Sequence, residues 1–238
     1  RKSPEWRYDT TTANQNVVES VSISADGEYI VAGEYYGKIH LFDKDNSTPL
    51  WSYSTGDNVY HTAISANGEY IAASSAHSNR KVYFFNKNSS TTLWSYAFDT
   101  NVNSLSISAD GSYLAVVCHE NDETDEVYFF GKDSNTPLWS YEADNVVRAV
   151  SISSDGEYIA VAIADKLHLF DKDSSTPLWN YTAENDVYTV SISADGEYIV
   201  AGSTSDKVYL FDKDSSIPIW SYATGHDISS VDISADGS

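Results

Sequence analysis

The 238-residue sequence contains no methionine and only one cysteine, Cys118. A single cysteine excludes an intrachain disulfide, and its place after the apolar run 114–117 predicts a buried, unreactive thiol on a strand. No apolar run approaches the roughly 18 residues that a membrane-spanning helix needs, and the first residues carry no signal-peptide pattern. We therefore expect no membrane insertion. Because the sequence begins at Arg1 and lacks methionine, we expect a processed form or an excerpt of a longer chain.

Basic side chains are also scarce. Lys and Arg number 14 against 35 Asp and Glu, which gives a formal net charge of −21 and a pI of about 4.3. A field of this sign repels nucleic acid and favours cationic partners, so we expect no nucleic-acid partner. Many of the acids recur at fixed intervals, as at Asp26, Asp43 and Asp45, which is typical of a solvated face. With 41% apolar residues, the composition is that of a folded chain.

Motifs of catalysis and of metal binding are missing. No Gly-x-Ser-x-Gly elbow and no glycine-rich phosphate loop occur, and none of the six histidines has the spacing of a metal ligand relative to another. The sequence therefore predicts a protein that is not an enzyme and has no cofactor. The histidines are His40, His61, His77, His119, His168 and His226.

The loop 119–126 is a weak candidate for calcium, because it carries five carboxylates and Ca²⁺ takes about six to eight oxygen ligands. Its candidate ligands are Asp122, Glu123 and Asp125. The alternative is an acidic loop that is solvated and binds no ion.

A repeat of about 42 residues dominates what is present. Its tryptophans, Trp6, Trp51, Trp94, Trp139, Trp179 and Trp220, are 40 to 45 residues apart. A phrase close to Ser-Ala-Asp-Gly-Glu-Tyr-Ile-Val-Ala-Gly follows each of them, and the phrase Lys-Val-Tyr-Leu-Phe-Asp completes the unit. Within the first unit, turn residues separate four extended runs at 18–24, 29–33, 38–43 and 50–53. The sequence therefore predicts four short strands in every repeat, without helices.

A four-stranded sheet cannot bury both of its faces alone, so successive sheets must stack, and stacking around an axis leaves few exposed edges. We therefore expect an all-β chain that forms one β-propeller of four-stranded antiparallel blades over residues 1–238. Its parts are a fourth strand at 1–8, five full repeats at about 17–222 and a first strand at 228–234. The segment that would complete the last repeat corresponds to residues 198–214, which predicts six blades. The alternative is seven or more blades, with the chain as an excerpt. Each tryptophan is expected to pack between neighbouring blades.

These phrases resemble the repeats of WD-repeat propellers, and Leu-Trp-Ser-Tyr-x-Thr-Gly at 50–56 resembles those of quinoprotein-type propellers. The resemblance implies the propeller fold, with strands a to d in each blade. Phe42-Asp43 stands where WD repeats have Trp-Asp, and the vicinal cysteine pair of the quinone-dependent dehydrogenases is missing. The second difference argues against quinone catalysis.

The loops between strands b and c, and between d and a, vary most among the repeats. In the resembled families both sets of loops share one face, so this face is the candidate binding surface. The second position of strand a varies most of all, and one residue from each blade is expected at the mouth of the central channel. The alternative is a set of solvated residues without a ligand. Arg148, the one cation of the set, is expected to hold an anionic group. The set comprises Glu19, Tyr60, Asn103, Arg148, Tyr188 and Ser229.

Three Asn-x-Ser/Thr sequons, at Asn46, Asn88 and Asn180, are candidates for glycosylation, although chance occurrence is the alternative. We therefore expect a secreted or cell-surface binding or scaffold protein, whose partner is a protein, a peptide or another copy of itself. One alternative is an enzyme or cofactor-binding propeller with a site at the channel. Another is a subunit of a self-assembling surface array.

Overall fold

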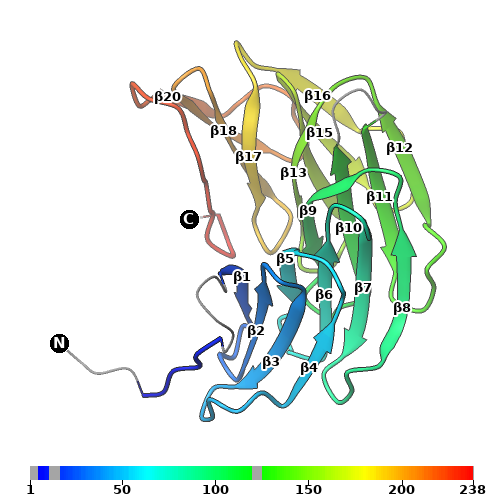
Figure 1. The fold of residues 1–238 in the computed structure, drawn as a ribbon. Helices are drawn as coiled ribbons and strands as arrows, with labels where there is room; N and C mark the ends of the chain where they lie inside the picture. The colour runs from blue at the N-terminus through cyan, green and yellow to red at the C-terminus, as the bar shows by residue number, and fades with distance from the viewer. Residues whose placement is uncertain (1–4, 11–16, 120–124, 238) are drawn as a thin grey trace. The chain divides into compact units, whose positions relative to one another are not determined.

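The computed structural model describes residues 5–10, 17–119 and 125–237. Twenty β-strands form five four-stranded antiparallel sheets, and in each sheet the strands a to d follow one another in chain order (Figure 1). No helix occurs in these ranges. The prediction of an all-β chain built from propeller-like blades is confirmed. The chain divides into two compact units, residues 1–102 and 103–238, and each is described by itself. That the whole chain forms one domain stays a prediction.

Unit 1 contains two sheets, and β9 begins at its end. The strands of the first are β1 (Val18–Ile23), β2 (Tyr29–Glu34), β3 (Lys38–Asp43) and β4 (Trp51–Ser54). Those of the second are β5 (Val59–Ile64), β6 (Tyr70–Ser75), β7 (Lys81–Asn86) and β8 (Thr92–Ala97).

Unit 2 contains three sheets. The strands of the first are β9 (Asn101–Ile107), β10 (Tyr113–His119), β11 (Asp125–Gly131) and β12 (Trp139–Ala143). The second consists of β13 (Val147–Ile152), β14 (Tyr158–Ile163), β15 (Lys166–Asp171) and β16 (Trp179–Thr182). The third consists of β17 (Val187–Ile192), β18 (Tyr198–Ser203), β19 (Lys207–Asp212) and β20 (Trp220–Ala223).

The burial of each strand follows its sequence pattern. The apolar b strands are covered on both faces, so Ile71, Ala72 and Ala73 of β6 are fully buried. The d strands alternate, and in β4 the half-buried Trp51 is followed by the exposed Ser52. The core of each unit therefore lies between successive sheets.

The d-strand tryptophan joins one sheet to the next. The indole N–H of Trp51 donates to the carbonyl of Lys87 at 2.7 Å, and the ring lies 5.2 Å from that of Phe85. In unit 2, Trp179 makes the same bond to the carbonyl of Lys213, at 2.6 Å. The prediction that these tryptophans pack between neighbouring sheets is confirmed at both positions.

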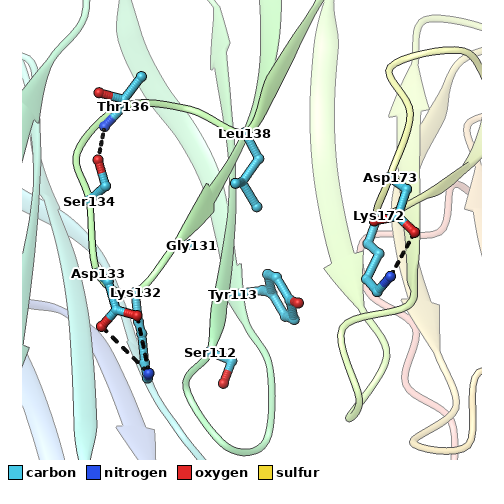
Figure 2. Close-up of a pocket in the computed structure, with 10 residues that line it drawn as sticks. All are labelled: Ser112, Tyr113, Gly131, Lys132, Asp133, Ser134, Thr136, Leu138, Lys172 and Asp173. Carbon is cyan, nitrogen blue, oxygen red and sulfur yellow. Dashed lines mark hydrogen bonds and ion pairs between the residues drawn. The ribbon is translucent and has the colours of Figure 1, made fainter.

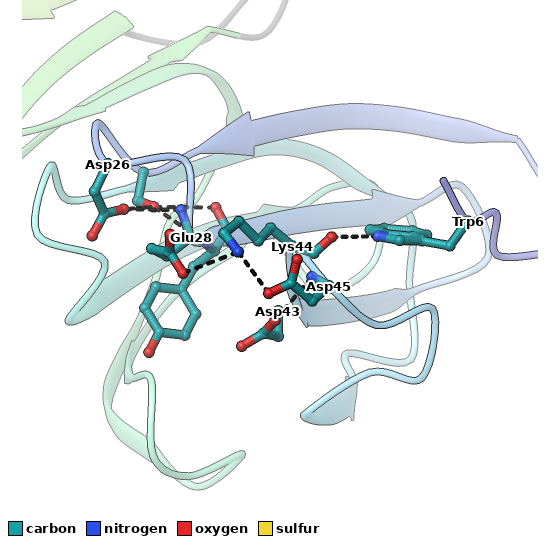
Figure 3. Close-up of polar contacts among 8 residues, drawn as sticks. Trp6, Asp26, Glu28, Asp43, Lys44 and Asp45 are labelled. Carbon is teal, nitrogen blue, oxygen red and sulfur yellow. Dashed lines mark hydrogen bonds and ion pairs between the residues drawn. The ribbon is translucent and has the colours of Figure 1, made fainter. Parts of the chain in front are cut away.

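The two end segments differ from the predicted strands. Residues 5–8 and 228–234 form no strand, because a strand requires a hydrogen-bonded neighbour and none pairs with either segment in the part of the chain that the structure describes. Residues 1–4 of the first segment lie outside the described residues. The contacts of the repeat nevertheless persist, since the Trp6 indole N–H donates to the carbonyl of Lys44 (Figure 3). Tyr8 likewise packs on Phe42, with ring centroids 5.1 Å apart.

The described residues contain no helix long and apolar enough to cross a membrane.

Candidate binding site

Four of the residues predicted at the channel mouth share one backbone feature. Glu19, Tyr60, Arg148 and Tyr188 each lie at a β-bulge, because the pairing of strand a with strand b shifts register across each of them. A bulge turns the extra side chain out of the regular alternation, and bulges are frequent beside functional sites. The sequence pattern showed that these positions vary, and the bulges explain why they can vary without disturbing the sheets.

The six predicted residues divide between the units. Glu19 and Tyr60 belong to unit 1, and the remaining four belong to unit 2. Asn103 lies on β9, whereas Ser229 lies in the segment that forms no strand, and it is exposed like Glu19. That all six surround one channel mouth stays a prediction.

In unit 1, Tyr60 is part of a group that we call the tyrosine cluster, formed by Tyr35, Tyr36, Tyr60 and His77. The ring of Tyr35 meets those of Tyr36 and Tyr60 edge-on, at 5.2 and 6.2 Å between centroids. The Tyr60 hydroxyl lies 3.1 Å from Nε2 of His77. Tyr36 is 51% exposed, so the cluster presents aromatic surface to solvent.

Backbone contacts hold the loop that carries His77. The amide N–H groups of His77 and Ser78 donate to the side chains of Asn101 and Asp57, at 2.9 and 2.7 Å. His77 and Arg80 have positive φ angles of 57° and 34°, a conformation that persists only where surrounding contacts impose it. These hydrogen bonds connect the b–c loop of this sheet with the chain segments before and after the sheet.

In unit 2, Arg148, Asp186 and Tyr188 form a second group, the arginine cluster. Arg148 Nη2 donates to Oδ2 of Asp186 at 2.6 Å, and its guanidinium lies 5.3 Å from the centroid of the Tyr188 ring. Asn103 donates from Nδ2 to the carbonyl of Val147 at 2.9 Å, which places it beside the same strand. Arg148 thus has its counter-ion within the chain, whereas the sequence predicted that it would hold an anionic group of a ligand.

We define two candidate surfaces by the loops that form them. The loop surface of unit 1 consists of residues 35–37, 55–60 and 76–80, and that of unit 2 of residues 144–148, 164–165 and 184–188. Asp186, Tyr35 and Tyr36 are members that the sequence analysis did not select. The sequence did contain an indication of these residues, because the b–c and d–a loops that carry them vary in length and residue type among the repeats.

The acidic loop gives no support to the calcium site. Asp122 and Glu123 lie outside the described residues. Asp125 is buried, and its carboxylate accepts from the amide of Val147 at 2.6 Å and lies 2.8 Å from Nδ1 of His119. Its oxygens are therefore used within the fold. In the described ranges, no group of three or more His, Cys, Asp or Glu side chains could hold a metal ion.

Two histidines of strand c, His40 and His168, are buried in the sheets. Burial lowers the pKa of His40, although the adjacent Glu34 carboxylate, 3.0 Å away, acts in the opposite direction. Burial lowers the pKa of His168 to about 4, and the last residue of the adjacent b strand is Ile163, where the first repeat has Glu34. In the described residues the Nδ1 atom of His168 has no hydrogen-bond partner.

A groove of about 480 Å³ lies at the opposite end of the sheets, at the a–b and c–d turns of unit 2 (Figure 2). Tyr113, Leu138 and Lys172 line it, and Gly131 contributes no side chain. Unit 1 repeats this groove between its two sheets, at about 340 Å³, with Tyr29, Leu50 and Lys87 in the same roles. Because it recurs with the repeat, we attribute it to the scaffold.

The three sequon asparagines are exposed. Asn46 and Asn88 lie in c–d turns, and Asn180 lies on β16. Their geometry therefore leaves room for modification.

Comparison with known families supports the repeat assignment. A family model described as outer membrane protein assembly factor BamB matches residues 3–101 and, in a second match, residues 78–236. These matches cover nearly the whole sequence and confirm the resemblance to quinoprotein-type propeller repeats. The likeness to WD-repeat propellers stays a prediction. No match to the chain was found among curated proteins.

Proposed function

The chain belongs to the family of quinoprotein-like repeat proteins described as outer membrane protein assembly factor BamB, and we propose that it is a non-catalytic module that binds a protein or peptide partner through its loop surfaces. An assembly factor acts on other proteins, which is consistent with such a role. Fold alone does not decide function, so the proposal depends on the residues of the loop surfaces.

The tyrosine cluster carries the proposal. Tyrosine is enriched at protein interfaces because its ring offers a large contact area and its hydroxyl offers a hydrogen bond at a low cost in conformational entropy. Tyr36 is 51% exposed, and the ring of Tyr35 contacts those of both Tyr36 and Tyr60. Because the adjacent loop is anchored through Asp57 and Asn101, little ordering would accompany binding.

Charge favours a cationic partner. The net charge of −21 attracts basic segments, and the face of a tyrosine ring attracts Lys or Arg. In unit 2 the chain itself supplies an example, since the Arg148 guanidinium lies over the Tyr188 ring and pairs with Asp186. We propose that Lys or Arg side chains of a partner bind the tyrosine cluster in a similar way, with the exposed Glu19 as an acid of unit 1 that can pair with them.

Calorimetric titration with two synthetic, unstructured peptides tests this function. The first alternates Lys with Ser and Gly, and the second has Glu in place of Lys. We expect saturable binding of the Lys peptide alone. The Tyr35→Ala/Tyr60→Ala double variant should bind about 10-fold more weakly, as expected for loss of a small hot spot.

Tyr222→Ala is the matched control, because Tyr222 is a 65% exposed tyrosine outside both loop surfaces. It should bind the Lys peptide as the unmodified chain does. Equal binding by the double variant and the control would contradict the proposal, since the attraction would then be unspecific.

We further propose that the five sheets are blades of a six-bladed ring and that the protein acts outside the cell or at its surface. The repeat length and the contacts of both end segments support the blade number. The three exposed sequons support the location. Expression in a glycosylating host, followed by enzymatic removal of N-glycans, tests the location: we expect a loss of mass that Asn46→Gln, Asn88→Gln and Asn180→Gln each reduce. An unchanged mass would contradict it.

A further inference from the structure

The third repeat differs from the other four at the end of its c strand. In the other four repeats the last residue of strand c accepts, through its side-chain oxygen, the amide N–H of the residue two positions further along the c–d turn, at 2.8 to 3.1 Å. The third repeat ends this strand with Gly131, which has no side chain to accept. The amide N–H of Asp133 therefore lacks the acceptor that the other repeats supply. The accepting residues of the other repeats are Asp43, Asn86, Asp171 and Asp212.

Neither the backbone nor the packing requires this glycine. The φ angle of Gly131 lies outside the left-handed region that favours glycine. Among the described residues, a Cβ atom at this position would meet only the methyl groups of Leu138, at the ordinary contact distances of 3.8 and 4.0 Å. The turn would therefore accommodate a side chain, and its absence leaves space in the adjacent groove.

A second acid is missing beside the same turn. In the other four repeats the lysine of the c–d turn pairs with a glutamate of the a–b turn, with 2.5 to 3.6 Å between Nζ and the carboxylate. The third repeat has Ser112 in place of that glutamate, and the carbonyl of Ser112 accepts the amide N–H of Lys132 at 2.9 Å. The third repeat therefore has neither of these acids, whereas each of the other repeats keeps at least one.

Gly131 lines the groove of about 480 Å³ at the a–b and c–d turns of unit 2 (Figure 2). The apolar surface of this groove comes from Tyr113 and from Leu138, which is 57% exposed. Lys172, from the next sheet, lines its other side. In the corresponding groove of unit 1, of about 340 Å³, Asp43 occupies the position of Gly131. The groove itself recurs with the repeat, but in unit 2 the space next to this turn is open.

We propose that this groove binds a small organic acid whose carboxylate takes the place of the side chain that is missing at Gly131. One carboxylate oxygen accepts the amide N–H of Asp133, as the side chain of the other repeats does within its own turn. The ammonium groups of Lys132 and Lys172, which both line the groove, attract the negative charge. The apolar body of the acid contacts Leu138.

The acids that remain in the groove do not prevent this binding. Asp133 and Asp173 pair with the lysines of their own turns at 3.4 and 2.7 Å, but their side chains are 89% and 77% exposed. Ion pairs this exposed contribute little to stability, so both carboxylates can turn towards solvent when a ligand binds. Lys172 also pairs with Glu157, at 3.5 Å, and keeps this partner. Because charges farther away than about 8 Å are largely screened at physiological ionic strength, the net charge of −21 opposes binding only weakly.

The internal repeat specifies the group that binds, because a carboxylate occupies this position in three of the other four repeats. Inorganic phosphate also carries negative charge, but it has no apolar body and would leave the exposed surface of Leu138 uncovered. The groove lies at the opposite end of the sheets from the loop surface of unit 2. The inference therefore does not depend on the partner of the loop surfaces.

The test is a titration of the whole isotope-labelled chain with benzoate, followed by nuclear magnetic resonance. We expect one-to-one binding and a saturable shift of the Asp133 amide resonance. Benzamide has the same body without the charge and should bind about 10-fold more weakly. Inorganic phosphate at the same concentration should not displace benzoate. Absence of a saturable shift at Asp133, equal binding of benzamide, or displacement by phosphate would overturn the proposal.

Three variants at one position separate this site from unspecific attraction. Gly131→Asp and Gly131→Asn each supply an acceptor to the Asp133 amide, as Asp171 and Asn86 do in their own turns. Both should therefore fold and should bind benzoate about 10-fold more weakly. Gly131→Ala is the control, because it adds a Cβ without an acceptor and should bind as the unmodified chain does. Since Asn is neutral, equal binding by Gly131→Asn and Gly131→Ala would show that charge alone attracts benzoate and would overturn the assignment.

Discussion

Arg148 on β13 and Asp186 in the loop before β17 form an ion pair, with 2.6 Å between Nη2 and Oδ2. The pair joins two neighbouring sheets of unit 2 at a β-bulge, with the Tyr188 ring beside the guanidinium. The Arg148 charge, which the sequence predicted to hold a ligand, therefore has a partner in the chain itself.

Replacing Asp186 should make the charge of Arg148 available to other anions. In Asp186→Asn we expect Arg148 to bind small anions, so that sulfate raises the melting temperature of the variant more than that of the unmodified chain. The pair is partly solvated, and its loss should cost no more than about 1 kcal/mol of unfolding free energy. Thermal melts at several sulfate concentrations and constant ionic strength measure both effects. If sulfate raised the melting temperatures of Asp186→Asn and of the Arg148→Gln/Asp186→Asn double variant equally, the prediction would be contradicted.

The inter-sheet tryptophan bond should contribute measurably to stability. Trp51→Phe keeps an aromatic ring but loses the hydrogen bond to the Lys87 carbonyl, and we expect a loss of about 1 to 2 kcal/mol in urea unfolding. Trp220→Phe is the matched control, because Trp220 has no such bond among the described residues and is 46% exposed. Similar losses of unfolding free energy in both variants would contradict the prediction, because they would show that the smaller ring, and not the lost hydrogen bond, lowers stability.

The glycine of the a–b turn is required for two separable reasons. Gly27 and Gly68 both have a positive φ, 73° and 72°, but only at Gly68 would a Cβ meet a neighbour, Tyr29 Cδ2 at 2.5 Å. Gly27→Ala should therefore cost about 1 kcal/mol from backbone strain alone. Gly68→Ala should cost a further 1 to 3 kcal/mol or so, because the ring of Tyr29 must move. Chemical unfolding of the two variants compares the costs, and equal values would contradict the contact.

His168 should make the chain less stable in mild acid. The unfolded chain binds a proton at this residue near pH 6.5 and the folded chain only near pH 4, because burial lowers the pKa of His168. The free energy of unfolding therefore falls as the pH drops from 6.5 to 4, by about 3 kcal/mol from this residue.

His168→Tyr introduces the residue that other repeats have at this position and should remove this part of the pH dependence. Urea unfolding at a series of pH values measures it. His226→Gln changes an exposed histidine and is the control that should keep the slope. A slope that His168→Tyr leaves unaltered would contradict the prediction.

The strands were predictable from the sequence because their turns repeat. The run expected at 38–43 coincides with β3, and the run expected at 18–24 ends one residue beyond β1. The bulges at Tyr60 and Arg148 were not predictable, since a bulge depends on the pairing of two strands and leaves no mark in one of them. Residues 5–8 and 228–234 are not in strands for a similar reason, because strand propensity needs a hydrogen-bonded neighbour to be realised.

The candidate site was predictable in part. Variation among the repeats selected Tyr60, Arg148 and Tyr188, whose backbone positions follow from the shared scaffold. It did not reveal that Asp186 neutralises Arg148, because that contact joins side chains 38 residues apart on neighbouring sheets. The sequence thus indicated which positions are free to vary, and side-chain packing determined which charges remain available to a ligand.

Hydrogen exchange of the whole chain, with and without the Lys-rich peptide, tests whether the tyrosine cluster binds a cationic partner. We expect slower exchange in the loop surface of unit 1, at residues 35–37, 55–60 and 76–80, and unchanged exchange at the c–d turns. The Tyr35→Ala/Tyr60→Ala variant should show no such change. Protection that appears at the c–d turns, or that persists in this variant, would contradict the assignment of the loop surface as the binding site.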